Sequence, residues 1–198
     1  QLQPAIAESW TPVDDTTWEF KIRQGVKFHN GEDLTAEDVK FSIERIPVVT
    51  GPMSMTIYTK RVESVEVVDD YTLHVKTNGT APSLPNDFVR LFIVPKSTGM
   101  EAGNDEFNSG AAAIGTGPYR FVSWEPKGDL VLERFDDYWG EAPHWERVVR
   151  KEIPDDAARV ASLRSGQVDL INYVPASDYP SMQGDSRLDT FVSDSLYI

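Results

Sequence analysis

Four pairs of adjacent aspartates are the residues of this sequence best suited to acid–base chemistry. A hydrolase of the two-carboxylate type needs both carboxyl groups to face each other across a cleft. These pairs fall instead at expected turns and at an expected helix start, where a carboxylate accepts hydrogen bonds from nearby backbone N–H groups. Such local roles are expected for Asp14–Asp15, Asp69–Asp70, Asp136–Asp137 and Asp155–Asp156.

The usual patterns of metal and nucleophile chemistry are absent from the sequence. The histidines His29, His74 and His144 are far apart and form neither an HxH nor an HExxH motif, so we expect them to be solvated or locally bonded. There is no cysteine and no GxSxG motif, and Ile114 is not followed by the Gly-Lys of a phosphate-binding loop. The sequence therefore predicts a protein that is not an enzyme, with no cofactor and no metal ligands.

The charge balance argues against one class of partner. Acidic residues outnumber basic residues by 32 to 19, which gives a formal net charge of -13, and no cluster of lysine or arginine stands out. Because nucleic-acid binding needs a concentrated basic surface, nucleic acid is not an expected partner. No apolar run reaches the length that a membrane-spanning helix requires.

The first half of the chain predicts strands and short helices. Trp18, Phe20 and Ile22 alternate with charged residues, as in a strand with one buried face. Thr35 and Asp38 form a capping-box pattern at the start of a helix that ends before Pro47. The other expected elements are a loop at 48–60, a hairpin of 62–68 and 71–77, a short helix at 82–91, a short buried strand at 92–95 and a surface loop at 101–113.

A rigid bend at residues 115–118 marks a change of architecture. Two glycines and a proline of fixed φ direct the strand that begins at Tyr119. Tyr119 and Phe121 belong to one face of that strand, and Val122 and Trp124 belong to the other. Apolar residues on both faces predict a strand that is buried on both sides.

The pattern after the bend alternates between strand and helix. Strands are expected at 148–153 and 168–174, and the helix between them has Asp155 as its N-cap and Gly166 at its end. A strand, a helix of about three turns and a second strand form a βαβ unit. We therefore expect the two strands to be parallel, with a right-handed connection.

The segment that begins at the bend also resembles a known family. The run GTGPYRFVSWEPKGDLVLERFDDYWG, residues 115–140, is similar to the characteristic segment of the extracytoplasmic solute-binding proteins of peptide and nickel ABC transporters. Other stretches agree in the same order along essentially the whole chain, namely AESW at 7–10, FKIRQGVKFHNG at 20–31, TAEDV at 35–39 and LRSGQVDLI at 163–171.

The resemblance implies an α/β (α+β) fold of the periplasmic-binding-protein type. In this interpretation a mixed sheet is joined to a smaller antiparallel sheet-and-helix subdomain. Residues 1–114 would form that small subdomain of the N-terminal lobe, and residues 115–198 would form part of the main α/β subdomain. Because proteins of this family are much longer, the chain is interpreted as a portion of the N-terminal lobe, without the second lobe.

The resemblance further implies a set of ligand-binding residues. Met53 stands where the family has the tyrosine of a Ser-Pro-Tyr sequence, and Arg90 resembles the arginine that nickel-binding relatives point at an anionic ligand. Asn172 or Tyr173 matches the residue at the end of the βαβ crossover. The full set is Met53, Tyr58, Arg90, Asn172, Tyr173 and Tyr197.

The function implied by the resemblance is ligand capture for import. The protein would be a monomer that binds di- to oligopeptides between two lobes and delivers them to ABC permease subunits in the membrane. It would act in the periplasm or another extracytoplasmic space, lipid-anchored if it comes from a Gram-positive source. A second hypothesis keeps the fold but changes the ligand to a nickel chelate, haem, an oligosaccharide or an opine, and a third is an enzyme or a folding helper.

Overall fold

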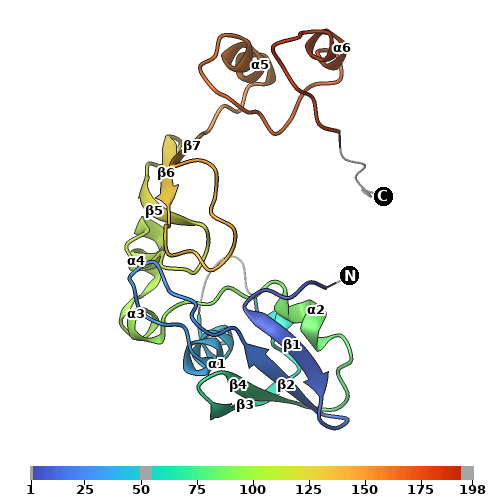
Figure 1. The fold of residues 1–198 in the computed structure, drawn as a ribbon, viewed down its shortest axis with the longest axis vertical. Helices are drawn as coiled ribbons and strands as arrows, with labels where there is room; N and C mark the ends of the chain where they lie inside the picture. Colours follow the sequence, from blue (N-terminus) through green and yellow to red (C-terminus); the bar gives the residue numbers. More distant parts are fainter. Residues whose placement is uncertain (1, 50–54, 193–198) are drawn as a thin grey trace. The chain divides into compact units, whose positions relative to one another are not determined.

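The computed structural model describes residues 2–49 and 55–192 of the 198-residue chain (Figure 1). The chain divides into two compact units, Gln1–Arg150 and Lys151–Ile198. Among the described residues, no helix combines the length and the apolar character needed to cross a membrane.

The first unit begins with a four-stranded antiparallel sheet. Its strands are β1 (Ala7–Pro12), β2 (Thr17–Ile22), β3 (Val62–Asp69) and β4 (Thr72–Thr77), arranged in the order β1-β2-β4-β3. Phe20 pairs with Leu73 across β2 and β4, and both side chains are buried. The alternation in β2 and the hairpin of β3 and β4 are therefore confirmed.

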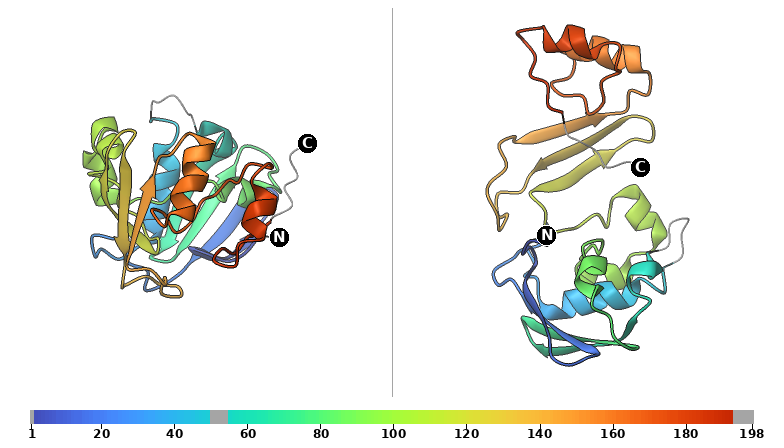
Figure 2. Two further views of the ribbon diagram at one scale, coloured as in Figure 1. Left: turned by 90° about the horizontal axis from the view of Figure 1, so that it is seen from above. Right: turned by 90° about the vertical axis from the view of Figure 1, so that its right-hand side faces the viewer.

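Helix α1 (Ala36–Arg45) lies across one face of this sheet (Figure 2). Its expected cap is present: the Asp38 carboxylate accepts hydrogen bonds from the N–H of Thr35 at 2.9 Å and from the Thr35 hydroxyl at 3.1 Å. The apolar face of α1 and the buried face of the sheet form one core, which consists of Phe20, Ile22, Val26, Phe28, Leu34, Ala36, Val39, Ile43, Val65, Leu73, Val75, Ala81 and Leu84.

Short helices connect this sheet to the rest of the unit. They are η1 (Thr56–Tyr58), α2 (Leu84–Phe88), α3 (Lys96–Glu101) and α4 (Asn104–Ser109). The helix expected near 82–91 is confirmed as α2, but residues 101–113, expected as a surface loop, contain α4. The Glu106 carboxylate accepts a hydrogen bond from the N–H of Gly103 at 2.9 Å, which caps the start of that helix.

The prediction of a short buried strand at 92–95 is wrong. Residues 91–95 form no strand, and the Phe92 side chain is 81% exposed. The N–H of Val94 donates to the Ser42 hydroxyl at 3.0 Å. Because a side chain satisfies this backbone donor, the segment needs no strand partner there.

A three-stranded sheet follows, with the order β5-β6-β7. It consists of β5 (Tyr119–Trp124), β6 (Asp129–Arg134) and β7 (Arg147–Lys151). The expected burial of β5 on both faces is wrong within the described chain, because Val122 is 47% and Trp124 is 49% exposed.

The second unit contains α5 (Asp156–Arg164) and α6 (Tyr179–Gln183). Asp155 caps α5 as expected, since its carboxylate accepts a hydrogen bond from the N–H of Ala158 at 2.7 Å. The strand expected at 168–174, and with it the βαβ unit, is wrong, because these residues pair with no strand and Leu170 is 78% exposed. A strand needs a neighbour for its backbone groups, and the Tyr173 carbonyl accepts instead from the Arg159 guanidinium at 3.4 Å.

Candidate functional site

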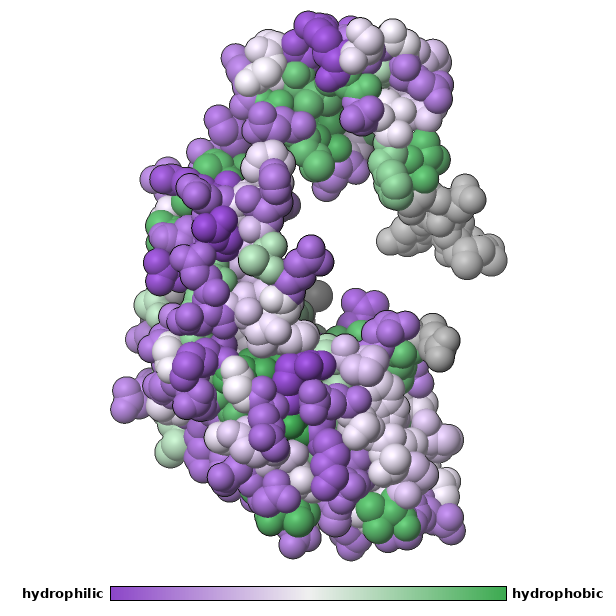
Figure 3. Space-filling model, viewed as in Figure 1, coloured by the Kyte–Doolittle hydropathy of each residue, from purple (hydrophilic) through white to green (hydrophobic). Residues whose placement is uncertain are grey.

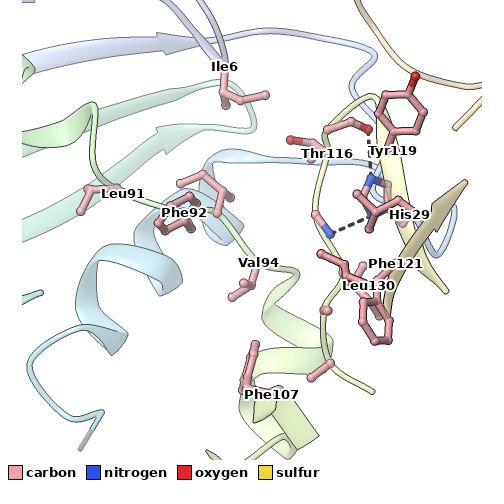
Figure 4. A pocket seen from close by; sticks show the side chains of 17 residues that line it. Ile6, His29, Leu91, Phe92, Val94, Phe107, Thr116, Tyr119, Phe121 and Leu130 are labelled. Atoms are coloured by element: carbon pink, nitrogen blue, oxygen red, sulfur yellow. Dashed lines mark hydrogen bonds between the residues drawn. The ribbon is translucent and has the colours of Figure 1, made fainter. Parts of the chain in front are cut away.

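The first unit contains an apolar pocket of about 570 Å³ (Figure 4). Most of its lining comes from the segment 91–94, the segment 112–117, and the hairpin of β5 and β6, and the other lining residues are Ile6, His29 and Phe107. Phe92, Val94 and Phe107 lie on one side of the pocket, and Phe121 and Leu130 lie on the other. Pockets of this size with mostly apolar walls are the usual sites for small ligands.

His29 fixes the loop that forms one wall of this pocket. Its Nδ1 accepts a hydrogen bond from the N–H of Gly115 at 3.3 Å, and its Nε2 lies 3.0 Å from the carbonyl of Gly117. These contacts are satisfied together by the neutral tautomer with the proton on Nε2. Trp139 Nε1 donates to the carbonyl of Thr116 between them at 3.2 Å. The bend is therefore held by both His29 and Trp139. His29 is bonded, but its partners lie 86 and 88 positions further along the chain, so the expectation of a solvated or locally bonded histidine is wrong here.

Gly110 allows α4 and β5 to approach closely at the same pocket. It ends α4 with a left-handed φ of 87°, which favours glycine. A Cβ atom at this position would collide with the ring of Phe121. The α4 end and the Phe121 wall of the pocket are thus packed together without room for another side chain.

A second pocket of about 220 Å³ shares the walls Phe92, Val94 and Phe107 with the first. Arg45, the last residue of α1, also lines it, and its guanidinium carbon lies 4.2 Å from the centre of the Phe107 ring. Burial lowers the pKa of the Arg45 guanidinium below its ordinary value. The two pockets together form what we call the apolar groove, with one cation at its smaller end.

Three of the four acidic pairs accept the backbone hydrogen bonds expected of them, whereas in the fourth the Arg134 guanidinium donates to Asp136 at 2.8 Å. Asp14 accepts from the N–H of Thr16 at 2.7 Å and Asp69 from the N–H of Tyr71 at 2.9 Å, and these backbone donors lower the pKa of both carboxyls. Within residues 2–49 and 55–192, no group of three or more histidine, cysteine, aspartate or glutamate side chains could hold a metal ion.

The structure does not bring the described members of the sequence-predicted ligand set to the groove. Tyr58 is half-buried in η1, and Arg90 is exposed with no hydrogen-bond or ion-pair partner for its side chain among the described residues. Asn172 and Tyr173 are exposed in the second unit. Two further members of the set, Met53 and Tyr197, lie outside the described residues, so all six assignments stay predictions.

Sequence reasoning missed three residues of the groove. Phe92 was expected inside a buried strand, Phe107 inside a surface loop, and Arg45 only as part of a helix. The acidic first turn of α4 at Asp105 and Glu106 could have revealed that helix and hence one face for Phe107. No local pattern could have placed Arg45 against a ring 62 positions further along the chain.

Known structures share this fold. The structure of NikZ from Campylobacter jejuni in complex with Ni(L-His) matches with a TM-score of 0.82 and 26% identity, covering 94% of this chain and 38% of that one. The fold is therefore that of a periplasmic-binding-protein-type lobe, as the sequence predicted.

The family follows from the whole chain. The model of the bacterial extracellular solute-binding proteins, family 5 Middle, matches residues 1–198, and the chain belongs to this family. The oligopeptide-binding protein AppA of Bacillus subtilis is 33% identical over 93% of the chain, and the heme-binding protein A of Haemophilus influenzae is 30% identical over 94%. The chain spans 35% of the first relative's length and 38% of the second's.

Proposed function

We propose that this chain is part of the substrate-binding component of an ABC importer that captures peptides outside the cytoplasm. The observation that carries the proposal is the family match along residues 1–198, together with the likeness to an oligopeptide-binding protein over nearly the whole chain. The complete protein would act as a monomer, close two lobes around a di- to oligopeptide and deliver it to permease subunits in the membrane.

The chemistry of the exposed candidate residues supports a peptide ligand. Arg90 can pair with a carboxylate, because its side chain has no other partner among the described residues. The Asn172 amide offers donors and an acceptor to a peptide backbone, and the Tyr173 ring offers an apolar wall with a polar end. Arg159 donates to the Tyr173 carbonyl and lies with its guanidinium carbon 5.6 Å from that ring, which restrains the tyrosine.

A second candidate keeps the fold and changes the ligand. The likeness to a heme-binding protein and to structures that hold Ni(L-His) or agropinic acid supports haem, a nickel chelate or an opine as the ligand in this alternative. The side chains that decide between these ligands lie in the cleft, and fold alone does not select among them. We propose transport rather than catalysis in either case.

Titration calorimetry on the full-length parent tests the proposal. A pool of di- to pentapeptides, haem and nickel with histidine are added in separate experiments, and the peptide pool is repeated with the 198-residue chain. Tight peptide binding by the parent with little binding by the chain supports the two-lobed receptor. If only haem or nickel–histidine binds, that ligand replaces the peptide in the assignment. If none of the three ligands binds, the peptide proposal and its haem and nickel alternatives are overturned.

The site assignment has its own test. Arg90→Gln and Tyr173→Ala in the parent are expected to weaken peptide binding by about tenfold each, since each removes one charged or aromatic contact. Arg120→Gln is the matched control, because Arg120 is exposed on β5 and already pairs with Glu133 at 3.2 Å. Equal affinities for all three variants would remove Arg90 and Tyr173 from the site.

A further inference from the structure

Arg45 is a partly buried cation without an anionic partner. Among the described residues, no carboxylate lies within ion-pair distance of its guanidinium, and the guanidinium donates no hydrogen bond to a protein atom. The chain has a net charge of -13, and other cations such as Lys96 and Arg134 pair with Glu37 and Asp136 at 2.9 and 2.8 Å. The lack of a counter-charge at Arg45 therefore does not follow from a shortage of acids.

Two local effects stabilise this cation in part. Arg45 lies in the last turn of α1, where the helix dipole favours positive charge, and it stacks on the Phe107 ring. Neither effect satisfies the five N–H donors of the guanidinium. Those donors remain available to an acceptor that enters the smaller pocket.

The walls around Arg45 restrict what that acceptor can be. Apart from Arg45 and Ser42, the smaller pocket is lined by apolar side chains, namely Ile46, Val49, Met55, Phe92, Val94 and Phe107. The Ser42 hydroxyl already donates to the Asp38 carbonyl at 2.7 Å and accepts from the N–H of Val94. Among the lining residues that the structure describes, an occupant thus meets one cation without an ion-pair partner and otherwise hydrocarbon.

The shared walls lead from this cation into the larger pocket. Phe92, Val94 and Phe107 border both cavities, and across the larger one stand Phe121 and Leu130 (Figure 4). About 220 Å³ is enough for a small head group, and about 570 Å³ is enough for an extended apolar chain.

We propose that the apolar groove binds an amphipathic monocarboxylate of the medium-chain aliphatic type. Its carboxylate forms a two-pronged contact with Arg45, because the planar guanidinium matches the two carboxylate oxygens. Its hydrocarbon chain passes Phe92, Val94 and Phe107 into the larger pocket. All of these residues belong to the first unit, so the site needs no second lobe and stands independently of the proposed peptide cleft.

Calorimetry with octanoate and octanamide on the full-length protein tests this site. The two probes have the same hydrocarbon chain and differ in charge, so octanoate is expected to bind about tenfold more tightly. Arg45→Gln should abolish that preference by lowering only the octanoate affinity. Arg120→Gln is the control, because Arg120 is an exposed cation that pairs with Glu133 and does not line the groove, so the preference should stay unchanged.

Other outcomes overturn the proposal. Equal binding of both probes to the unaltered protein, or an unchanged preference in Arg45→Gln, would show that Arg45 does not hold the carboxylate. If Arg45→Gln does not fold, Phe92→Ala provides the test, because Phe92 is 81% exposed and its replacement should leave the fold intact. This change should lower the affinities for octanoate and octanamide equally. Unchanged affinities in Phe92→Ala would show that the hydrocarbon chain of the probe does not pass Phe92. Displacement of octanoate by a peptide pool would assign the groove to a peptide instead.

Discussion

The four-stranded sheet with α1 and the second unit differ in how much apolar surface they bury. The sheet and α1 enclose one continuous core, in which side chains such as Phe28, Leu34 and Leu73 have no exposed surface. In the described part of the second unit, only Val160 and Met182 are buried apolar side chains. Hydrophobic side chains gather at the surface beside α5 instead (Figure 3).

This contrast separates local from non-local sequence signals. Both regions form the helix ends that their sequences predict, with Asp38 as a cap for α1 and Asp155 for α5. A helix satisfies most of its own backbone groups, whereas a strand takes its hydrogen bonds from another segment. The sheet region supplies such partners to β2, β3 and β4, and the described second unit supplies none to residues 168–174.

The largest expected effect comes from emptying the core of the first region. Leu73→Ala should lower the free energy of unfolding of the 198-residue chain by about 2–5 kcal/mol, because it removes a fully buried side chain and leaves a cavity. Leu170→Ala is the matched change in the second unit and should stay within about 0.5 kcal/mol, because Leu170 is 78% exposed. Urea denaturation followed by circular dichroism measures both.

Similar losses in the two leucine variants would break the comparison. They would mean that the second unit is packed as densely in solution as the sheet and α1. Repeating Leu170→Ala in the full-length parent sharpens the test, since a larger loss there than in the chain would identify Leu170 as buried by residues outside this chain.

A smaller difference is expected between the two helix caps. The Asp38 carboxylate is 8% exposed and accepts from the N–H and hydroxyl of Thr35 and from the N–H of Lys96 at 2.8 Å. Asp38→Ala should therefore lower the free energy of unfolding by about 2–3 kcal/mol, since three partly buried donors lose their charged acceptor. Asp155→Ala removes an exposed cap with one bond and should cost about 1 kcal/mol.

Thermal unfolding of both Asp→Ala variants checks this order. Asp38→Asn is the control, because it keeps the shape of the side chain and part of its capacity to accept hydrogen bonds. The stability of Asp38→Asn should therefore lie between those of the wild type and Asp38→Ala. An Asp155→Ala loss as large as that of Asp38→Ala would show that burial adds nothing to a cap.

Much of the first region could be predicted because its signals are local or pairwise. The alternation around Phe20 predicted β2, the Thr35–Asp38 pattern predicted the start of α1, and the family resemblance predicted the type of lobe. The errors at 92–95, at Val122 and Trp124, and at 168–174 share one cause. Apolar residues indicate that a surface can be buried, but they do not say which segment covers it.

The groove was harder to predict than the fold. Phe92, Phe107 and Arg45 come from three separate segments, and only the packing of α1, α4 and residues 91–94 brings them together. The resemblance directed attention to Arg90, Asn172 and Tyr173, which lie outside both pockets. Family motifs indicate where ligand contacts are expected in a new sequence. A groove that forms only when separate segments pack together has no sequence motif.

The smallest expected effect is a difference in carboxyl pKa between a local ion pair and a non-local one. The Arg187 side chain lowers the pKa of Asp185 to about 2, and these residues are neighbours in sequence. A hydrogen bond with His74 lowers the pKa of Glu19, but this pair exists only while β2 and β4 are joined. Carboxyl titration by NMR in water and in denaturing urea should therefore show a lowered Asp185 pKa that partly survives unfolding. The Glu19 pKa should lose the lowering due to His74 and keep only the smaller lowering due to its sequence neighbour Lys21.

The sign of the pH dependence follows from those directions. A carboxyl whose pKa is lower in the folded chain stabilises it fully above the unfolded pKa and loses that contribution as the pH falls through the folded value. For Asp185 the folded pKa is about 2, and the contact with Arg187 that survives unfolding keeps the unfolded pKa below 3.8, so the window is narrower than this difference. Arg187→Gln should return the Asp185 pKa toward 3.8 and leave Glu19 unchanged, while His74→Gln should do the reverse. A Glu19 pKa that still responds to His74→Gln in urea would mean that β2 and β4 remain paired there, and the distinction between local and non-local contacts would be wrong for this pair.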